Sequence, residues 1–143
     1  MKSPILKFSM AVPLSLLFAL LWIVFYSSCS KPNLGDIVRK HIKAVNNDDV
    51  EKNLSFFTDD AVFEVFEEAT LSGKNELRDL MESDAVNKAR LTIIDMETEG
   101  NTVIAHLIEK NEGQRLLGIE EAPFKAIYKF HGRLIIRRTP ITY

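Results

Sequence analysis

The pattern of apolar and polar positions begins with a helical repeat after position 33. Asn33 can cap the helix. The positions that share one face of this helix, at offsets of 3, 4, 7, 8 and 11, are Leu34, Ile37, Val38, His41, Ile42 and Val45. Asn46 and Asn47 end the repeat. Asp48 followed by Glu51 then predicts the capped start of a second, short helix.

The next segments alternate between strand and helix signals. Turn residues lead into a β-rich run at residues 61–66, and residues 67–71 are expected to form a loop with a short extended piece. Ser72 and Gly73 open a third helix. The side chains of this helix that we expect to point inward are Leu77, Leu80 and Met81.

The rest of the chain is rich in β-forming residues and turn signals. Four strand segments are predicted, at residues 89–97, 102–110, 115–130 and 133–141. Gly118 and Pro123 are expected to divide the third of them or to form a bulge in it. Helices followed by antiparallel strands predict an α+β fold with the helices on one face of a strongly curved sheet.

The N-terminal segment has a different composition from everything that follows. Residues 8–30 carry no charged side chain, Lys2 and Lys7 precede them, and all 20 acidic residues follow them. This layout is typical of a secretory signal, and the apolar run is also long enough to span a bilayer as a helix. We therefore expect residues 1–28 to be a signal peptide or a hydrophobic membrane-anchor helix, and residues 29–33 to be a tether. The domain itself covers residues 34–143 and faces away from the cytoplasm.

Cys29 is the only cysteine of the chain and stands where the apolar run ends. Residues 26–29, YSSC, resemble a bacterial lipobox, which implies that Cys29 is lipidated and becomes the first residue of the mature protein. Ser30 resembles the residue of lipoproteins that are sorted to the outer membrane. The resemblance implies a location in the bacterial cell envelope. The alternative is a single-pass anchor in the inner membrane with the domain on the same outer side.

Charge and metal-ligand patterns exclude some classes of function. Of the 18 basic residues, Lys2 and Lys7 precede the apolar run, so 16 remain against 20 acidic residues, a formal charge of −4. This argues against nucleic acid as a partner. His41, His106 and His131 are scattered, and no zinc-binding sequence motif is present, so we predict no metal and no cofactor.

Two sequence stretches carry a resemblance to a known family. The stretch VRKHIKAVNNDDVEKNLSFFTDDAVFEV at residues 38–65, followed by LSGKNEL at residues 71–77, resembles the nuclear transport factor 2-like superfamily, closest to its SnoaL-like and ketosteroid isomerase-like branch. The resemblance covers about residues 34–138. It implies a cone-shaped domain with a pocket between the helices and the concave face of the sheet. It also implies a homodimer formed through the sheet.

The resemblance bears on catalysis through three positions. It places His41 where the isomerases have a catalytic tyrosine, so His41 would be the acid or base if the chain were an enzyme. The two isomerase acids fall on Val65 and Ala126, which cannot carry a proton. The resemblance therefore implies a domain that lacks the chemistry of these isomerases.

The expected pocket is mainly apolar and suits a small hydrophobic ligand. Its candidate residues are Val38, His41, Ile42, Phe57, Phe63, Val65, Met81, Leu107 and Phe124. The same residues could instead fill an ordinary core. Arg138 is expected to share a face with Leu134 and Ile136, either at the mouth of the pocket or at a solvated strand end.

Three functions remain open at this point. The first is an envelope-anchored, non-catalytic domain that binds a small hydrophobic ligand or a partner protein. The second is a dimer or assembly module that uses the convex face of the sheet. The third is an isomerase-, cyclase- or hydrolase-like enzyme that uses His41 as its acid or base.

Overall fold

A computed structural model of the chain describes residues 32–65 and 69–142. The predicted signal or anchor helix and Cys29 lie outside the described residues. Pro32–Tyr143 is a compact unit by itself. Among the residues that are described, no helix is long and apolar enough to cross a membrane.

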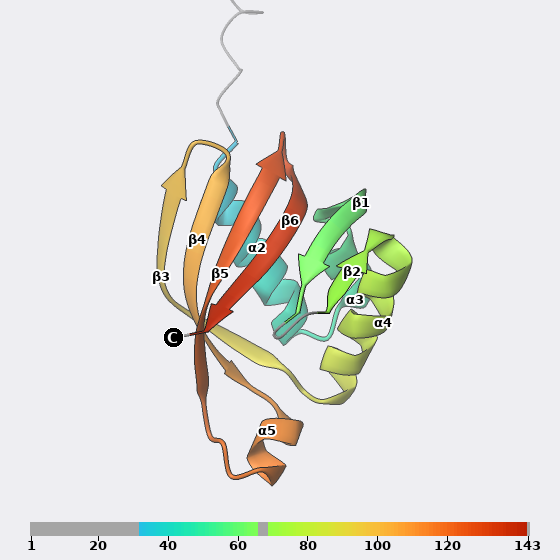
Figure 1. Cartoon of the computed structure of the whole chain (residues 1–143), viewed down its shortest axis with the longest axis vertical. Helices are drawn as coiled ribbons and strands as arrows, with labels where there is room; N and C mark the ends of the chain where they lie inside the picture. The colour runs from blue at the N-terminus through green and yellow to red at the C-terminus, as the bar shows by residue number, and fades with distance from the viewer. Residues whose placement is uncertain (1–31, 66–68, 143) are drawn as a thin grey trace, which may run out of the picture. The chain divides into compact units, whose positions relative to one another are not determined.

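The described residues form four helices and six strands, and Figure 1 shows their arrangement. The helices are α2 (Leu34–Asn46), α3 (Val50–Leu54), α4 (Gly73–Val86) and α5 (Glu112–Leu116). The strands are β1 (Phe57–Glu64), β2 (Thr70–Ser72), β3 (Arg90–Glu99), β4 (Thr102–Lys110), β5 (Ala122–His131) and β6 (Leu134–Thr142).

The strands form one sheet in the order β2-β1-β6-β5-β4-β3. Helix α2 lies along one face of this sheet, and α4 lies beside β1 and β2 (Figure 1). The predicted α+β class, with helices on one face of a curved sheet, is confirmed. The sheet is not wholly antiparallel, because β1 and β6 pair in parallel. These two strands come from opposite ends of the domain, so no hairpin connection forces them to run in opposite directions.

The cap of the first helix is where the sequence places it, but the cap of the second is not. Asn33 accepts a hydrogen bond from the backbone N–H of Asp36. Asp49, rather than Asp48, caps α3 by accepting from the N–H of Lys52 at 3.0 Å. Asp48 instead has φ +57°, and its carboxylate pairs with Arg90 at 2.8 Å, so it belongs to the turn between the helices.

The predicted strand at residues 115–130 begins with a helix in the structure. Asn111 caps α5 by accepting a hydrogen bond from the N–H of Gln114 at 2.7 Å, and Glu112 pairs with Arg115 one turn later. These local interactions favour a helical turn over an extended start. Strand β5 consequently begins only at Ala122, while the strand predicted at residues 102–110 is confirmed as β4.

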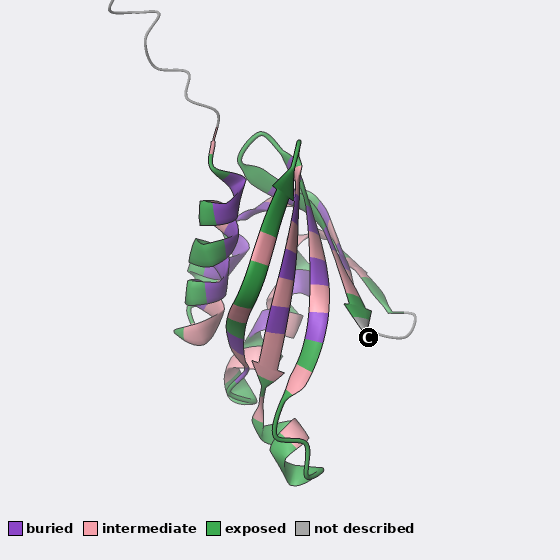
Figure 2. Cartoon of the chain, turned by 90° about the vertical axis from the view of Figure 1, so that its left-hand side faces the viewer, coloured by how far each residue is buried: buried purple, intermediate pink, exposed green. Residues whose placement is uncertain are grey.

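The core lies between α2 and the inner face of the sheet. Figure 2 shows the buried side of α2 turned toward the strands and its exposed side turned outward. The largest side chains that are fully buried are Tyr128, Phe57, Phe124, Phe130, Leu77 and Leu107. Strands β4 and β5 alternate between buried and partly exposed positions, as expected for strands that cover a core on one face.

Candidate functional site

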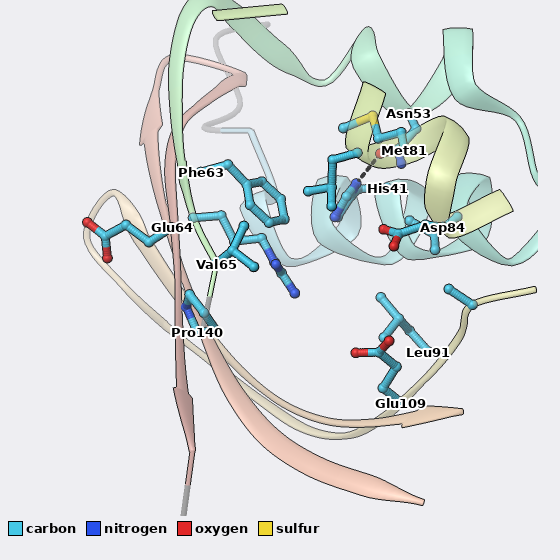
Figure 3. A pocket seen from close by; sticks show the side chains of 14 residues that line it. His41, Asn53, Phe63, Glu64, Val65, Met81, Asp84, Leu91, Glu109 and Pro140 are labelled. Carbon is cyan, nitrogen blue, oxygen red and sulfur yellow. Dashed lines mark hydrogen bonds between the residues drawn. The ribbon is translucent and has the colours of Figure 1, made fainter. Parts of the chain in front are cut away.

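A pocket of about 170 Å³ opens between α2, α4 and the inner face of the sheet. Figure 3 shows its wall from close by. Its apolar lining comes from Val45, Phe63, Val65, Leu80, Met81 and Leu91. The polar side chains that contribute to it are His41, Asn53, Glu64, Asp84, Glu109 and Arg138. The carboxylate of Glu64 points away from the pocket in Figure 3 and pairs with Arg137 at 2.7 Å, so five polar groups remain.

His41 and Asn53 form a buried hydrogen bond between the first two helices. The Nδ1 atom of His41 lies 2.6 Å from Oδ1 of Asn53. Because an amide oxygen only accepts, Nδ1 must carry the proton and donate it. Nε2 then keeps a free lone pair, and it has no hydrogen bond to any of the described residues. The His41–Asn53 pair thus offers the pocket a hydrogen-bond acceptor in a fixed orientation.

The imidazole of His41 is neutral at physiological pH. Its residue is 3% exposed, and burial lowers its pKa to about 3, with a further contribution from the positive charge of Arg138. The hydrogen bond to Asn53 acts in the opposite direction but is the smaller effect. The ring packs edge-on against Phe57 at 5.3 Å and Tyr128 at 5.6 Å between centroids. His41 can therefore accept a proton only weakly, and its role toward the pocket is to accept a hydrogen bond at Nε2.

Arg138 lies inside the domain, whereas a strand that alternates regularly would place it on the same side as Leu134 and Ile136. Leu134 is 39% exposed and Ile136 is 37% exposed, but Arg138 is only 8% exposed. The register between β5 and β6 shifts between Lys129 and Phe130, so that Ile136 has no partner in the ladder. This bulge turns Arg138 to the inner face and corrects the expectation that the three side chains share one face.

The guanidinium of Arg138 is stacked among aromatic rings. It lies 4.3 Å from the centroid of Phe63, 5.5 Å from Phe124 and 5.9 Å from Tyr128. Its Nε and the hydroxyl of Tyr128 are both buried without a hydrogen-bond partner in the described part of the chain. Such contacts hold the cation in place by cation–π attraction, yet they leave its Nε–H donor unused.

Asp84 reaches the pocket from the last turns of α4. Its carboxyl group points into the cavity below His41 (Figure 3). Burial raises its pKa to about 6, repulsion from Glu109 adds to this, and Arg138 acts against it. A carboxyl group with this pKa can both hold and release a proton near neutral pH.

Glu109 faces Asp84 from the sheet side of the pocket (Figure 3). It continues the inward alternation of β4 after Ala105 and Leu107, and it stands opposite Leu91 in the β3–β4 ladder. One carboxylate oxygen accepts a hydrogen bond from Nδ2 of Asn111 at 2.7 Å. Its charge therefore contributes to the field around Asp84 from a fixed position.

The structure distributes the residues predicted for the pocket over two places. His41, Phe63, Val65 and Met81 line it. The others belong to the packed core, namely Val38, Ile42, Phe57, Leu107 and Phe124. Of the two positions where the isomerase acids are missing, Val65 lies at the pocket and Ala126 is buried within the sheet.

Sequence reasoning missed three polar residues of the pocket, and two of them had a visible signal. Asp84 follows Leu77 and Met81 at helical spacing, which places all three on the buried face of α4. Glu109 follows the inward residues of β4 with period two. Asn53 had no comparable signal, since its partner His41 lies twelve positions away on another helix.

The pocket therefore combines one cation, two carboxyl groups and a neutral imidazole–amide pair inside an apolar wall. This set can orient a small molecule, neutralise an anionic group on it and exchange a proton with it. Across residues 32–65 and 69–142, no group of three or more His, Cys, Asp or Glu side chains is placed to hold a metal ion.

Solved structures share this fold at low sequence identity. An NTF2-like protein of unknown function from Cytophaga hutchinsonii matches with a TM-score of 0.66 and 16% identity, over 79% of this chain and 92% of that one. An uncharacterized cystatin fold protein from Novosphingobium aromaticivorans matches with 0.66 and 22%, over 78% and 99%. The epoxide hydrolase/cyclase-like enzyme SalBIII, with a role in pyran ring formation in salinomycin, matches with 0.69 and 15%, over 76% and 88%. At these identities the likeness establishes the NTF2-like fold alone.

A search of curated proteins found no significant match.

The sequence does match a family model over most of the domain. Residues 38–137, which run from within α2 to the first part of β6, match the model of the SnoaL-like domain. This is more than half of the chain, and the chain therefore belongs to the SnoaL-like domain family.

Proposed function

We propose that this chain binds a small, partly apolar organic molecule in the pocket beside His41. The observation that carries the proposal is the convergence of polar side chains with unused hydrogen-bonding capacity, above all Arg138, on a largely apolar pocket. Buried polar groups are normally satisfied within the protein, so unused donors around a cavity support a ligand as their partner.

Binding of a neutral probe tests this proposal. Phenylacetamide added to ¹⁵N-labelled Pro32–Tyr143 should shift the amide resonances of pocket residues such as Val65 and Leu91. Leu91→Trp should abolish these shifts, because the indole would occupy the cavity. Ile119→Trp is the matched control, since Ile119 is exposed in the segment that connects α5 and β5. Shifts that survive Leu91→Trp would place binding elsewhere and contradict the proposal.

A second candidate function is acid–base catalysis in the same pocket, with Asp84 as the proton carrier. Its pKa of about 6 supports this candidate. The expectation of a non-catalytic pocket came from the resemblance to the isomerases, whose two acids fall on Val65 and Ala126. Asp84 and Glu109 line the cavity from other elements. The pocket thus has two acidic side chains, as the isomerases do, but at different positions.

Deuterium exchange of an enolisable ketone, such as cyclohexanone, distinguishes catalysis from binding alone. An enzyme of this kind should accelerate exchange of the protons next to the carbonyl group, and Asp84→Asn should remove the acceleration. Asp79→Asn is the control, because Asp79 is on the exposed side of the same helix. If Asp84→Asn leaves the exchange rate unchanged, Asp84 is not the proton carrier.

We also propose that the domain is anchored in a bacterial cell envelope through its N-terminal segment. The support is the uncharged run at residues 8–30 and the position of Cys29 at its end. Mass spectrometry of the purified N-terminus should find a lipid-modified Cys29 after cleavage, or the intact segment if residues 1–28 serve as a membrane anchor. Release of an unmodified, truncated chain into the medium would contradict both forms of the anchor.

A further inference from the structure

Arg138 is the charged group of the pocket that its protein neighbours leave unpaired. The residue is 8% exposed, its Nε has no hydrogen-bond partner, and it forms no ion pair among the described residues. The charge of Arg138 acts to lower the pKa of Asp84, but the two side chains do not form an ion pair. A buried guanidinium is costly unless an anion or several acceptors accompany it. Arg138 lines the pocket, so a ligand there could supply the partner that the described residues do not.

We propose that the ligand of this pocket is a small monocarboxylic acid with an apolar body, bound with its carboxylate on Arg138. The proposal rests on the proposed function and specifies the chemical class of the ligand. The planar fork of a guanidinium matches a carboxylate through two parallel N–H···O hydrogen bonds. Phe63, which supports the guanidinium from one side, belongs to the same wall that would hold the apolar part of the ligand.

The remaining charges of the pocket limit the ligand to a single negative charge. Asp84 and Glu109 line the same cavity, and burial together with repulsion from Glu109 already raises the pKa of Asp84. A second negative charge on the ligand would meet these two carboxyl groups in a poorly screened environment. Phosphate monoesters and dicarboxylates should therefore bind more weakly than a monocarboxylate.

Because His41 is neutral, its imidazole does not add a second cation to the pocket. An imidazolium beside Arg138 would compete with it for the carboxylate, but the positive charge of Arg138 and burial keep His41 unprotonated. The carboxylate is thus directed to one cation rather than shared between two.

Four matched phenyl compounds test the proposal on wild-type Pro32–Tyr143 at pH 7.5, a unit that contains the whole core found among the described residues. Phenylacetate should bind at least about tenfold more tightly than phenylacetamide, which has the same shape without the charge. Phenyl phosphate and phenethylamine should bind more weakly than phenylacetate. Equal affinity for phenylacetate and phenylacetamide, or a preference for phenethylamine or phenyl phosphate, would overturn the inference.

Variants of neighbouring arginines assign the preference to one side chain. Arg138→Gln should reduce the preference for phenylacetate over phenylacetamide to about onefold, and Arg138→Lys should keep part of it because the charge remains. Arg137→Gln is the control, since Arg137 is exposed on the same strand and pairs with Glu64. An unchanged preference in a folded Arg138→Gln would also overturn the inference.

The comparison within the wild-type protein separates this inference from the proposed function. If Arg138→Gln does not fold, the ratio of the two affinities in the wild type still decides. Binding of both phenylacetate and phenylacetamide without preference would leave the proposed function intact and refute the monocarboxylate. Failure of all four compounds to bind would contradict both.

Discussion

Asn46 and Leu91 exchange two hydrogen bonds across 45 positions of sequence. The side-chain Nδ2 of Asn46 donates to the backbone oxygen of Leu91 at 2.8 Å, and the backbone N–H of Leu91 donates to Oδ1 of Asn46 at 2.7 Å. The amide of Asn46 thus acts as a strand partner for the start of β3. It fixes the last turn of α2 to the edge of the sheet and holds Leu91 in the wall of the pocket.

Asn46→Ala should destabilise the domain by about 1–3 kcal/mol, because both backbone groups of Leu91 lose a partly buried partner. Urea unfolding followed by circular dichroism measures the change. Asn47→Ala is the matched control and should change the unfolding free energy by less than about 0.5 kcal/mol, because Asn47 is exposed. Equal effects of the two substitutions would show that the Asn46–Leu91 contact does not stabilise the fold.

The burial of His41 predicts a loss of stability in acid. Its pKa is about 3 in the folded state and 6.5 in the unfolded state. The stability that the neutral imidazole contributes is therefore complete above pH 6.5 and declines as the pH falls toward 3. Between pH 6.5 and 5.0 the loss of unfolding free energy amounts to about 2 kcal/mol. Urea unfolding at pH 5.0 and 7.5 should show that His41→Gln removes this loss. His131→Gln is the control and should leave the acid-side loss of stability unchanged, because His131 is exposed at the end of β5.

Asp84 should have the opposite effect on the pH dependence. Its folded pKa of about 6 lies above the ordinary value of 3.8. The stability that the protonated carboxyl group contributes is therefore fully present below pH 3.8 and is lost as the pH rises through 6. Asp84→Asn should therefore stabilise the domain at pH 7.5, by up to about 3 kcal/mol, and make the acid-side loss of stability steeper. Asp79→Asn should change neither quantity. A flat or reversed response of Asp84→Asn would show that the carboxyl group is not destabilised at neutral pH.

The sequence predicted the fold well wherever a single face of an element is buried. The helical repeat of α2 and the alternation of β4 reproduce the burial seen in the structure, because each pattern reports directly on which side faces the core. The start of β5 was mispredicted for the opposite reason. The segment of α5 has no buried residue, so only its cap at Asn111 and the pair between Glu112 and Arg115 determine its helical form.

The site was harder to predict because its key residue depends on an irregularity. Leu134 and Ile136 follow the expected alternation, and extrapolating it would put Arg138 outside. The unpaired Ile136 at the bulge reverses the phase, and no turn residue or proline in the sequence marks that position. Asp84 and Glu109 were predictable from their own helix and strand, but their proximity depends on how α4 packs against the sheet.

The outer face of the sheet carries apolar side chains on the strands at its centre. Residues out of phase with the buried positions of β4, β5 and the end of β6 include Ile104, Ile108, Ile127 and Ile141. Ile104 lies directly opposite Ile127, and Lys125 lies opposite Ile141. No helix among the described elements covers this face, where apolar side chains alternate with His106 and Lys125, and exposed apolar side chains that gather on one face are typical of an interface.

We therefore predict that Pro32–Tyr143 forms a homodimer through this outer face. Light scattering after size exclusion should give twice the mass of the chain at micromolar concentration. Ile127→Lys should weaken the dimer at least about tenfold, because it places a charge at the centre of an apolar contact. Leu117→Lys is the control, since Leu117 is 79% exposed but lies at the end of α5, away from the strands at the centre of the sheet. A wild-type chain that remains a monomer at millimolar concentration would contradict the dimer, and equal weakening by both substitutions would place the interface elsewhere.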